Sequence, residues 1–490
     1  MKDLIKKVKR KKSSDILFVV CMIAIALVFR SFLLNKYLFF GYEQARDLFE
    51  VEKILGGDLK LLGPPTDIAG IYHGVIYLYI LLPFYFIFDG DPYKIEMCLI
   101  AINSLSVLFL YLAVKNHFNE KIARLSTVLY VVNYSSIVYA RWLSNTTLIP
   151  ACAILLYYFL VKSKTNWKYL FGVVIFWGLI LNFHEVVGMS LLPGIVGFIC
   201  VEKIKLRLKQ VLAISLSVPC VFTTYGIYEI KNDFLMTKAL LGYFSGGGVG
   251  STGLSSFYTF IEEVADNIYT LSPRFSFLVI VVTVVVFSRK YLINRHVLAT
   301  LFLSLSPLVF FLCFGIVPLR HFFITIPVFL PVLIALLVWN MDKNKINLKL
   351  FPVYVLVIVC SVWVYKNNIL ANKPTFIYNA QRTYLGDLKN VIDWTYINSN
   401  GNYFSYNYYS VPYWKEEMWE YMFRWYGKNT HGRLPVREKT DVYFTLIEPN
   451  LFIPVHQDNW YGEYKKDSEL IDTYQSGQLE VEMRRAKKTI

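Results

Sequence analysis

The chain has 490 residues, of which 56% are hydrophobic and only 17% are charged, and its mean hydropathy is +0.44. Soluble domains carry about 25% charged residues, so this composition excludes an ordinary soluble protein and indicates a polytopic membrane protein. The formal net charge of +15 does not point to nucleic acid, because the lysines cluster in short loops between apolar stretches, where they set membrane orientation. All seven cysteines lie in or beside apolar stretches, so neither disulfides nor a cysteine-rich metal site is expected.

The amino-terminal part of the chain sets the expected orientation. Residues 1–14 form a basic tail, which the positive-inside rule places in the cytoplasm. The first span follows at residues 16–34; it is too long for a signal peptide and lacks the small-residue cleavage site. The chain should therefore stay anchored and emerge outside, so that an outer loop at residues 36–92 faces away from the cytoplasm.

That outer loop contains two carboxylates, Glu43 and Asp47, four residues apart with Arg46 between them. On a helix this spacing puts both acids on one face, about one turn apart. The apolar residues of the stretch are Leu48, Phe49, Val51, Ile54 and Leu55, and Gly56-Gly57 follow. The pattern predicts an amphipathic helix at the membrane surface, with its acids turned towards a cavity and its end at the glycines. A solvated loop is the alternative.

Twelve apolar stretches, the first span included, are candidate spans. The later ones lie at about residues 71–88, 93–114, 122–139, 147–161, 169–183, 186–201, 209–229, 275–288, 297–317, 321–340 and 350–365. Basic loops lie at residues 162–168, 203–209, 289–295 and 343–349, and all of them become cytoplasmic only if one stretch fails to cross. The weakest stretch is 71–88, because it is short and framed by prolines. The sequence predicts about eleven crossings, with 71–88 dipping in and returning inside the first outer loop.

Two further regions are expected outside. The loop at residues 231–274 contains a glycine-rich run, which suits either a substrate lid or a plain linker. After the transmembrane part at residues 15–366, the composition becomes polar, and residues 367–490 are long enough for a small α/β domain. Its expected elements are helices at 388–397 and 414–426 and strands at 403–409, 441–447 and 479–483. Most of its aromatic residues should form its core.

Five polar sites converge on the outer side under this topology, where isolated ionisable groups are costly and therefore indicate function. They are Glu43 with Arg46 and Asp47, then His73, Arg141 with Asn145, His184 with Glu185, and Arg320 with His321. Opposite charges at one membrane face suit an anionic headgroup, because arginine and histidine can hold a phosphate while a carboxylate accepts a proton. Each residue alone also fits a structural role as an interfacial anchor or a packed side chain.

Six short motifs follow one another along the chain. They are YEQARD at residues 42–47, LGPPT at 62–66, YHGVIY at 72–77, YARWLSN at 139–145, GLILNFH at 178–184, and RHFF at 320–323 leading to Pro331. Together they resemble glycosyltransferase family 39, the group of protein O-mannosyltransferases and aminoarabinose transferases, and especially its uncharacterised prokaryotic branch. The resemblance covers roughly residues 15–365.

The resemblance implies the type C glycosyltransferase fold, with many transmembrane helices and an active site at the outer face of the cytoplasmic membrane. Such enzymes transfer a hexose or pentose from a polyprenyl-phosphate carrier and usually invert the anomeric centre. The family's first-loop acid falls on Glu43, where relatives usually have Asp, so Asp47 can share or own the role of base. The second acid sometimes found beside it is Gln44 here.

The remaining expectations concern partners and rivals. The acceptor can be a lipid, a glycan or a protein, and no nucleic acid is expected. No cofactor is required; a divalent cation between the acids and the phosphate stays open, although no metal-ligand spacing supports it. The alternatives are a flippase or transporter for lipid-linked glycans, against which stands the absence of an obvious inverted repeat, and a glycan polymerase.

Overall fold

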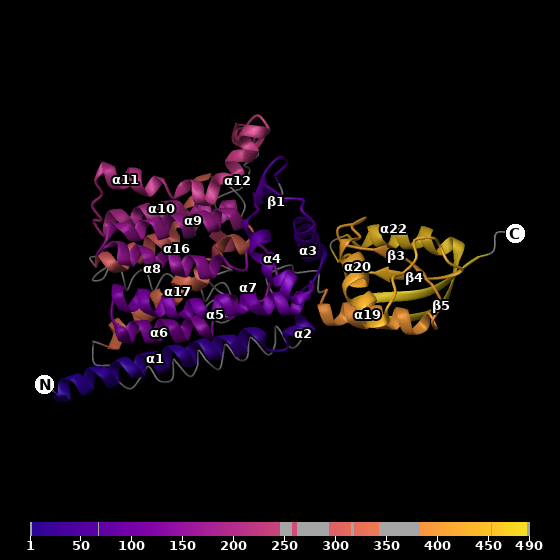
Figure 1. The fold of residues 1–490 in the computed structure, drawn as a ribbon, viewed down its shortest axis with the longest axis horizontal. Helices are drawn as coiled ribbons and strands as arrows, with labels where there is room; N and C mark the ends of the chain where they lie inside the picture. Colours follow the sequence, from indigo (N-terminus) through magenta and orange to yellow (C-terminus); the bar gives the residue numbers. More distant parts are fainter. Residues whose placement is uncertain are drawn as a thin grey trace.

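The structure is a computed structural model and describes residues 2–66, 68–245, 257–261, 294–314, 318–342, 383–451 and 453–487. Figure 1 shows a helical bundle at one end of the molecule and a separate α/β domain, formed by the carboxyl-terminal residues, at the other. The glycine-rich run at 246–251 and the candidate spans at 275–288 and 350–365 lie outside the described residues.

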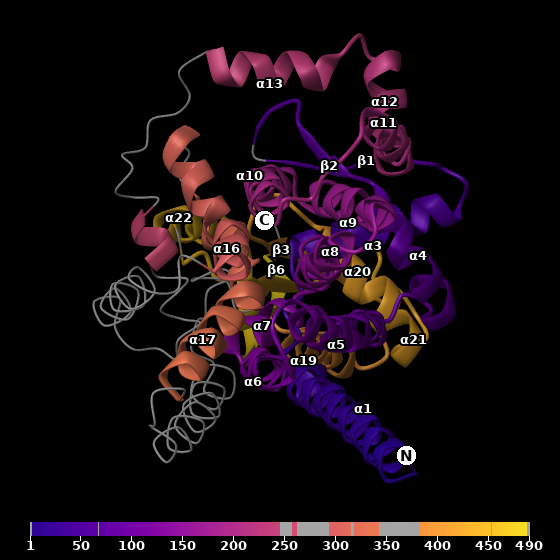
Figure 2. The same ribbon diagram turned by 90° about the vertical axis from the view of Figure 1, so that its left-hand side faces the viewer.

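The long helices of the bundle lie side by side (Figures 1 and 2). They are α1 (Lys2–Ser31), α5 (Pro92–His117), α6 (Glu120–Val131), α8 (Ile149–Ser163), α9 (Leu170–Phe183), α10 (Glu185–Val201), α16 (Arg295–Phe314) and α17 (Ile326–Asp342). Short elements between them are α7 (Tyr134–Tyr139) and the 3₁₀ turns η1 (Trp167–Tyr169) and η2 (Arg320–Phe323). At the rim lie α11 (Leu208–Ser215), α12 (Val218–Lys231) and α13 (Leu235–Ser245).

Three described helices are long and apolar enough to cross a membrane: Ser13–Ser31 within α1, α5 and α16. The pair α11 and α12, bent by 52°, makes a fourth if it is one broken span. The other apolar helices of the bundle have 10–17 residues, which gives about 15–25 Å of helix against a hydrocarbon core of about 30 Å. The helical membrane architecture agrees with the prediction, but the number of eleven crossings is not confirmed.

Residues 36–92, the outer loop predicted from the sequence and called the first outer loop below, fold into a short layer beside the bundle. It contains α2 (Leu34–Tyr37), α3 (Tyr42–Leu55), β1 (Leu62–Pro65), β2 (Tyr72–Gly74) and α4 (Ile76–Phe88). The predicted acidic helix is confirmed as α3, which starts after Gly41 and ends at Gly56. Leu48, Val51 and Ile54 are buried, while Leu55 is 40% exposed, so the apolar face is narrower than the sequence suggested.

The carboxyl-terminal domain has a four-stranded sheet in the order β3-β4-β6-β5. Its strands are β3 (Ser405–Tyr409), β4 (Val442–Ile447), β5 (Ser468–Ser476) and β6 (Leu479–Ala486), with β3 parallel to β4 and the other pairs antiparallel. Its helices are α19 (Leu385–Asn398), α20 (Glu417–Met422) with a π-helical turn at Phe423–Gly427, α21 (Lys428–His431) and α22 (Pro454–Tyr464). In Figure 1 the sheet lies between α22 and α19.

The elements predicted in this region are confirmed, and three were missed: the short helix α21, strand β5 and helix α22. Strand β5 is exposed along most of its length, so it lacks the alternation of apolar and polar residues that identifies a half-buried strand. Helix α22 has no buried residue and therefore no apolar stripe. As expected, many aromatic residues form the core, among them Trp419, Tyr409 and Tyr443, whereas Trp414 is exposed.

The carboxyl-terminal domain is docked on the first outer loop. The backbone of Leu385 donates to the carbonyl of Leu38 at 2.8 Å, and the Tyr421 hydroxyl donates to the carbonyl of Gly90 at 2.5 Å. The Tyr421 ring also contacts Phe40 and Phe49, with ring centroids 5.5 and 5.2 Å apart. Helix α3 is therefore held between the bundle and this domain.

Gly74 gives a test of how tightly the outer loop packs on the bundle. A Cβ at Gly74 would overlap the side chain and Cα of Asn182, whose Nδ2 donates to the carbonyls of Gly178 and Val221 at 3.0 and 2.7 Å. Gly74→Ala should destabilise the protein by about 1–3 kcal/mol, as overpacking of a buried contact usually does. Thermal unfolding in detergent measures the loss. Gly226→Ala is the control, because a Cβ there has open space; equal melting temperatures for both variants would contradict the packing.

Candidate active site

A cavity of about 300 Å³ lies where the first outer loop meets the bundle. Its walls come from α3, the segment around β1 and β2, the loop after α7, the junction of α9 and α10, and η2. The lining residues are Glu43, Arg46, Asp47, Pro65, Thr66, Ile68, His73, Trp142, Ser144, Asn145, Thr146, His184, Glu185, Val186, Leu319, His321 and Phe322. Segments far apart in sequence thus bring acids, cations and imidazoles into one small space.

An ion pair within α3 forms one wall. The Nε and Nη2 atoms of Arg46 lie 2.9 and 2.8 Å from the same oxygen, Oδ1 of Asp47, whose side chain is only 7% exposed. Burial raises the pKa of Asp47 above its usual 3.8, although the Arg46 charge acts in the opposite direction. Glu43 lies one turn earlier on the same helix and is less buried than Asp47. The two acids therefore have different environments.

A second ion pair joins the outer loop to the bundle. Nδ1 of His73 in β2 lies 2.8 Å from Oε2 of Glu185, the first residue of α10. Burial alone would lower the pKa of His73, but the Glu185 carboxylate outweighs it and the pKa is raised above 6.5. The Glu185 carboxylate therefore favours the protonated, positively charged form of His73.

His184 has the opposite character. It lies at the junction of α9 and α10, between the rings of His73 and His321, with centroids 5.3 and 5.4 Å away. Burial lowers the pKa of His184 to about 4, so the imidazole is neutral at pH 7. Its Nδ1 is buried and has no hydrogen-bond partner among the described residues. Because His184 lines the cavity, a bound ligand can fill that hydrogen bond.

The loop after α7 contributes neutral polar groups. Nδ2 of Asn145 donates to the carbonyl of Phe183 at 2.7 Å, which fixes the amide against the end of α9. The hydroxyls of Ser144 and Thr146 are 2.8 Å apart beside it. Sequence reasoning singled out Asn145 and missed these two hydroxyls, although their place in the same loop was the available signal.

Most of the residues singled out from the sequence meet at this cavity, with two exceptions. Arg141 does not line it; this buried side chain donates from Nη1 to the carbonyl of Phe32 at 2.7 Å. That bond ties the loop after α7 to the end of α1. The backbone of Arg320 lies in η2, but its side chain is outside the described part of the structure.

A group able to hold a metal lies elsewhere. Among the described residues, ligand atoms of His117, Glu202 and His296 lie within 4.8 Å of one another. Glu202 follows α10 at the end opposite Glu185, about 25 Å away along the helix. The negative charge of the Glu202 carboxylate is already balanced by a lysine, because Nζ of Lys164 lies 3.2 Å from Oε2 of Glu202. The acids of the cavity form no such three-ligand group within the described ranges.

Comparison with known proteins gives a consistent result. Residues 72–227 match the family model of dolichyl-phosphate-mannose-protein mannosyltransferase. The crystal structure of ArnT from Cupriavidus metallidurans bound to undecaprenyl phosphate superposes with a TM-score of 0.59 at 11% identity, covering 96% of this chain and 98% of that one. The chain has the fold of ArnT. The predicted type C glycosyltransferase fold and the resemblance to family 39 are confirmed.

Two further matches are a second structure of ArnT and a weaker match to an oligosaccharyltransferase. ArnT in the apo state gives a TM-score of 0.57 at 12% identity over the same shares of both chains. The archaeal oligosaccharyltransferase AglB from Archaeoglobus fulgidus, in complex with an inhibitory peptide and a dolichol-phosphate, gives 0.48 at 12% identity and covers 87% of this chain and 64% of that one. No curated protein matches the chain by sequence.

The His73–Glu185 pair predicts a pH dependence of stability. Because the folded pKa of His73 is raised, the pair's contribution is fully present below the ordinary pKa of 6.5 and is lost as the pH rises through the folded value. Above 6.5 the wild-type melting temperature should therefore fall more steeply than that of Glu185→Gln, which lacks the partner charge. Melting curves from pH 6 to 9 measure the difference, and parallel profiles for the two proteins would contradict a raised pKa of His73.

Proposed function

We propose that the protein is a membrane glycosyltransferase that moves a sugar from a polyprenyl-phosphate carrier to an acceptor at the outer face of the cytoplasmic membrane. The observation that carries this proposal is the cavity itself, where two acids of α3 meet Arg46, a His73 whose pKa is raised by Glu185, and a neutral His184. The fold shared with ArnT, a protein solved with undecaprenyl phosphate, supports the class of carrier.

The donor phosphate would be held by Arg46, His73 and His184. Arg46 is fixed by Asp47 and is 20% exposed, so its remaining N–H groups can reach a phosphate oxygen. The protonated form of His73, which Glu185 favours, adds a second positive charge, and His184 supplies a hydrogen bond. Fixed donors of this kind stabilise the negative charge that grows on the leaving phosphate in the transition state.

Glu43 is our candidate for the general base. Asp47 is buried and committed to Arg46 through Oδ1, so its role is to orient that guanidinium. Glu43 lies on the same cavity wall, one turn nearer the helix start and less buried, where an acceptor arriving from water can reach it. This assignment agrees with the position of the family's first-loop acid.

The transfer follows as one displacement at the anomeric carbon. The acceptor oxygen, or nitrogen, bonds to that carbon while its proton passes to Glu43. The bond from the carbon to the phosphate oxygen breaks, and its electron pair leaves on the polyprenyl phosphate. Attack opposite the leaving group inverts the anomeric centre, and nearby carboxylates stabilise the oxocarbenium character of the transition state. We propose that the cationic side chains stabilise the leaving phosphate and that no metal ion is required.

We also propose that the amino terminus lies in the cytoplasm.

Two variants separate the roles of the acids. Glu43→Gln should lower kcat by about 10²–10⁴-fold, the usual contribution of a general base, with little change in donor KM. Asp47→Asn should instead raise donor KM by about tenfold, because it releases Arg46. The matched control is Asp58→Asn, an exposed carboxylate of the same loop that does not line the cavity; it should behave as wild type. The reverse pattern would make Asp47 the base, and full activity in both variants would refute the proposal.

The decisive assay is the release of polyprenyl phosphate. Purified protein in proteoliposomes is supplied with radiolabelled undecaprenyl-phosphate sugars and a membrane extract as acceptor source. A transferase releases undecaprenyl phosphate, and Glu43→Gln abolishes that release. A flippase or transporter would move the intact lipid across the bilayer without releasing it, and a polymerase would give products that lengthen with time.

A further inference from the structure

The catalytic cavity continues along α3 towards the carboxyl-terminal domain. A second hollow of about 480 Å³ lies between α3 and α20 and shares Arg46 with the cavity. On the α3 side it is lined by Arg46, Phe49, Glu50, Glu52 and Lys53. Glu43, Arg46, Glu50 and Lys53 are spaced by three or four residues and therefore lie on one face of the helix. This polar face extends about 15 Å along α3.

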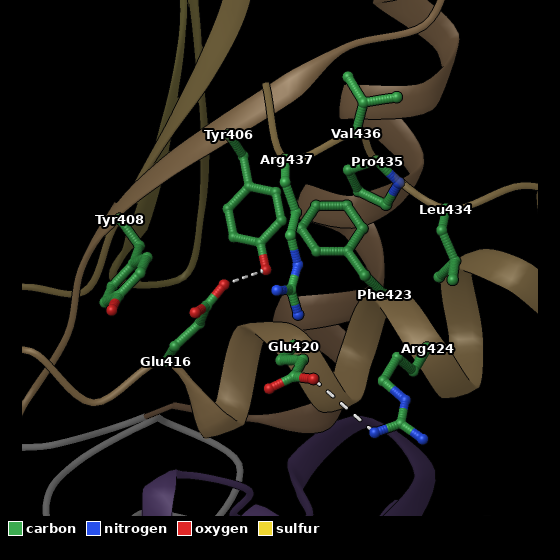
Figure 3. A pocket seen from close by; sticks show the side chains of 10 residues that line it. All are labelled: Tyr406, Tyr408, Glu416, Glu420, Phe423, Arg424, Leu434, Pro435, Val436 and Arg437. Carbon is green, nitrogen blue, oxygen red and sulfur yellow. Dashed lines mark hydrogen bonds and ion pairs between the residues drawn. The ribbon is translucent and has the colours of Figure 1, made fainter. Parts of the chain in front are cut away.

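A third hollow continues the path over the carboxyl-terminal domain. Its volume is about 680 Å³, and it shares Glu420 and Arg424 of α20 and its π-helical extension with the second hollow (Figure 3). The three spaces therefore succeed one another through shared lining residues, from Glu43 and Asp47 to the sheet of the carboxyl-terminal domain. We call the second and third hollows the distal groove.

The far end of the distal groove combines aromatic rings with groups that form hydrogen bonds. The Tyr406 hydroxyl donates to Oε1 of Glu416 at 2.6 Å, and the Tyr406 ring stacks on Phe423 with centroids 4.5 Å apart. In Figure 3 the side chain of Arg437 runs past this pair of stacked rings. Arg437 is exposed and makes no hydrogen bond or ion pair with another residue in the described part of the chain. Tyr408 lines the same wall from β3.

The chemistry of the distal groove selects a class of ligand. Carboxylates and cationic groups alternate along it, with Glu50 and Lys53 on one side and Glu420 and Arg424 on the other. An anionic polymer would meet repelling acids throughout its length, and a basic one would meet repelling cations. A neutral chain rich in hydroxyls suits both kinds of group, and its C–H faces can pack on Tyr406 and Tyr408.

We propose that the distal groove binds a neutral saccharide chain, whose end reaches Glu43 as the acceptor. This rests on the proposed function, because it names the acceptor of the same active site. Residues of the saccharide that do not react would lie along α3 and over Tyr406, Tyr408 and Arg437. The carboxyl-terminal domain then acts as the part of the protein that recognises the acceptor.

The test is saccharide binding to the full-length protein in nanodiscs, without any sugar donor. The probes are neutral linear hexasaccharides of mannan, glucan and chitin type, with neutral hexapeptides for comparison, observed by saturation-transfer difference NMR. We expect at least one hexasaccharide to bind. Tyr408→Ala and Arg437→Ala should each weaken that binding by about tenfold, the cost of one lost stacking or charge-assisted contact. The matched controls Tyr403→Ala and Arg485→Ala alter exposed residues that do not line the groove, and they should bind as wild type does.

Three results would overturn the proposal: no hexasaccharide binds, binding is the same in all four variants, or only the hexapeptides bind. The binding assay needs no turnover, so it is independent of the release assay for undecaprenyl phosphate. Saccharide binding without release of undecaprenyl phosphate would refute the proposed transferase activity but support saccharide binding in the distal groove. Release of undecaprenyl phosphate without saccharide binding would refute only the proposed binding of a saccharide in the distal groove.

Discussion

The ion pair of Arg46 and Asp47 is the constraint on which the candidate site depends. Two nitrogens of the guanidinium share one buried carboxylate oxygen, so neither side chain can turn away without leaving a charge unpaired. The pair is rigid because α3 is itself held from both sides. Leu48 and Val51 pack in the core, and Tyr421 of the carboxyl-terminal domain contacts Phe49 on the other side.

His73 and His184 show how one small cavity can hold two histidines with different pKa values. His73 and His184 have rings 5.3 Å apart, yet only His73 has a carboxylate within hydrogen-bonding distance among the described residues. That carboxylate outweighs the cost of burial for His73, whereas burial prevails for His184. Two neighbouring imidazolium ions would repel each other, so charging the first helps to keep the second neutral. A histidine that favours its protonated form, beside a neutral one, suits a phosphate that must be bound and then released.

The sequence predicted the helix with the acids and the convergence of most polar sites, because both follow from local spacing and from membrane topology. Glu43 and Asp47 were placed on α3 by helical periodicity alone. The number of crossings did not follow in the same way, since helices such as α8 and α10 are shorter than the bilayer core and hydropathy cannot tell how they are arranged. The buried position of Arg141 involves a hydrogen bond to the backbone carbonyl of Phe32, which lies far away in sequence, so no local pattern predicts it. The distal groove depends on the docking of α20 against α3, and no pattern within either segment predicts that contact.

The central claim is that a polyprenyl phosphate binds in the cavity beside α3, and the most direct measurement is a cryo-electron microscopy structure of the protein with undecaprenyl phosphate in nanodiscs. The account predicts phosphate density within hydrogen-bonding distance of Arg46 and His184, with the lipid tail leading into the bilayer. Density at the opposite end of the bundle instead, beside Lys164 and Arg295, would contradict it.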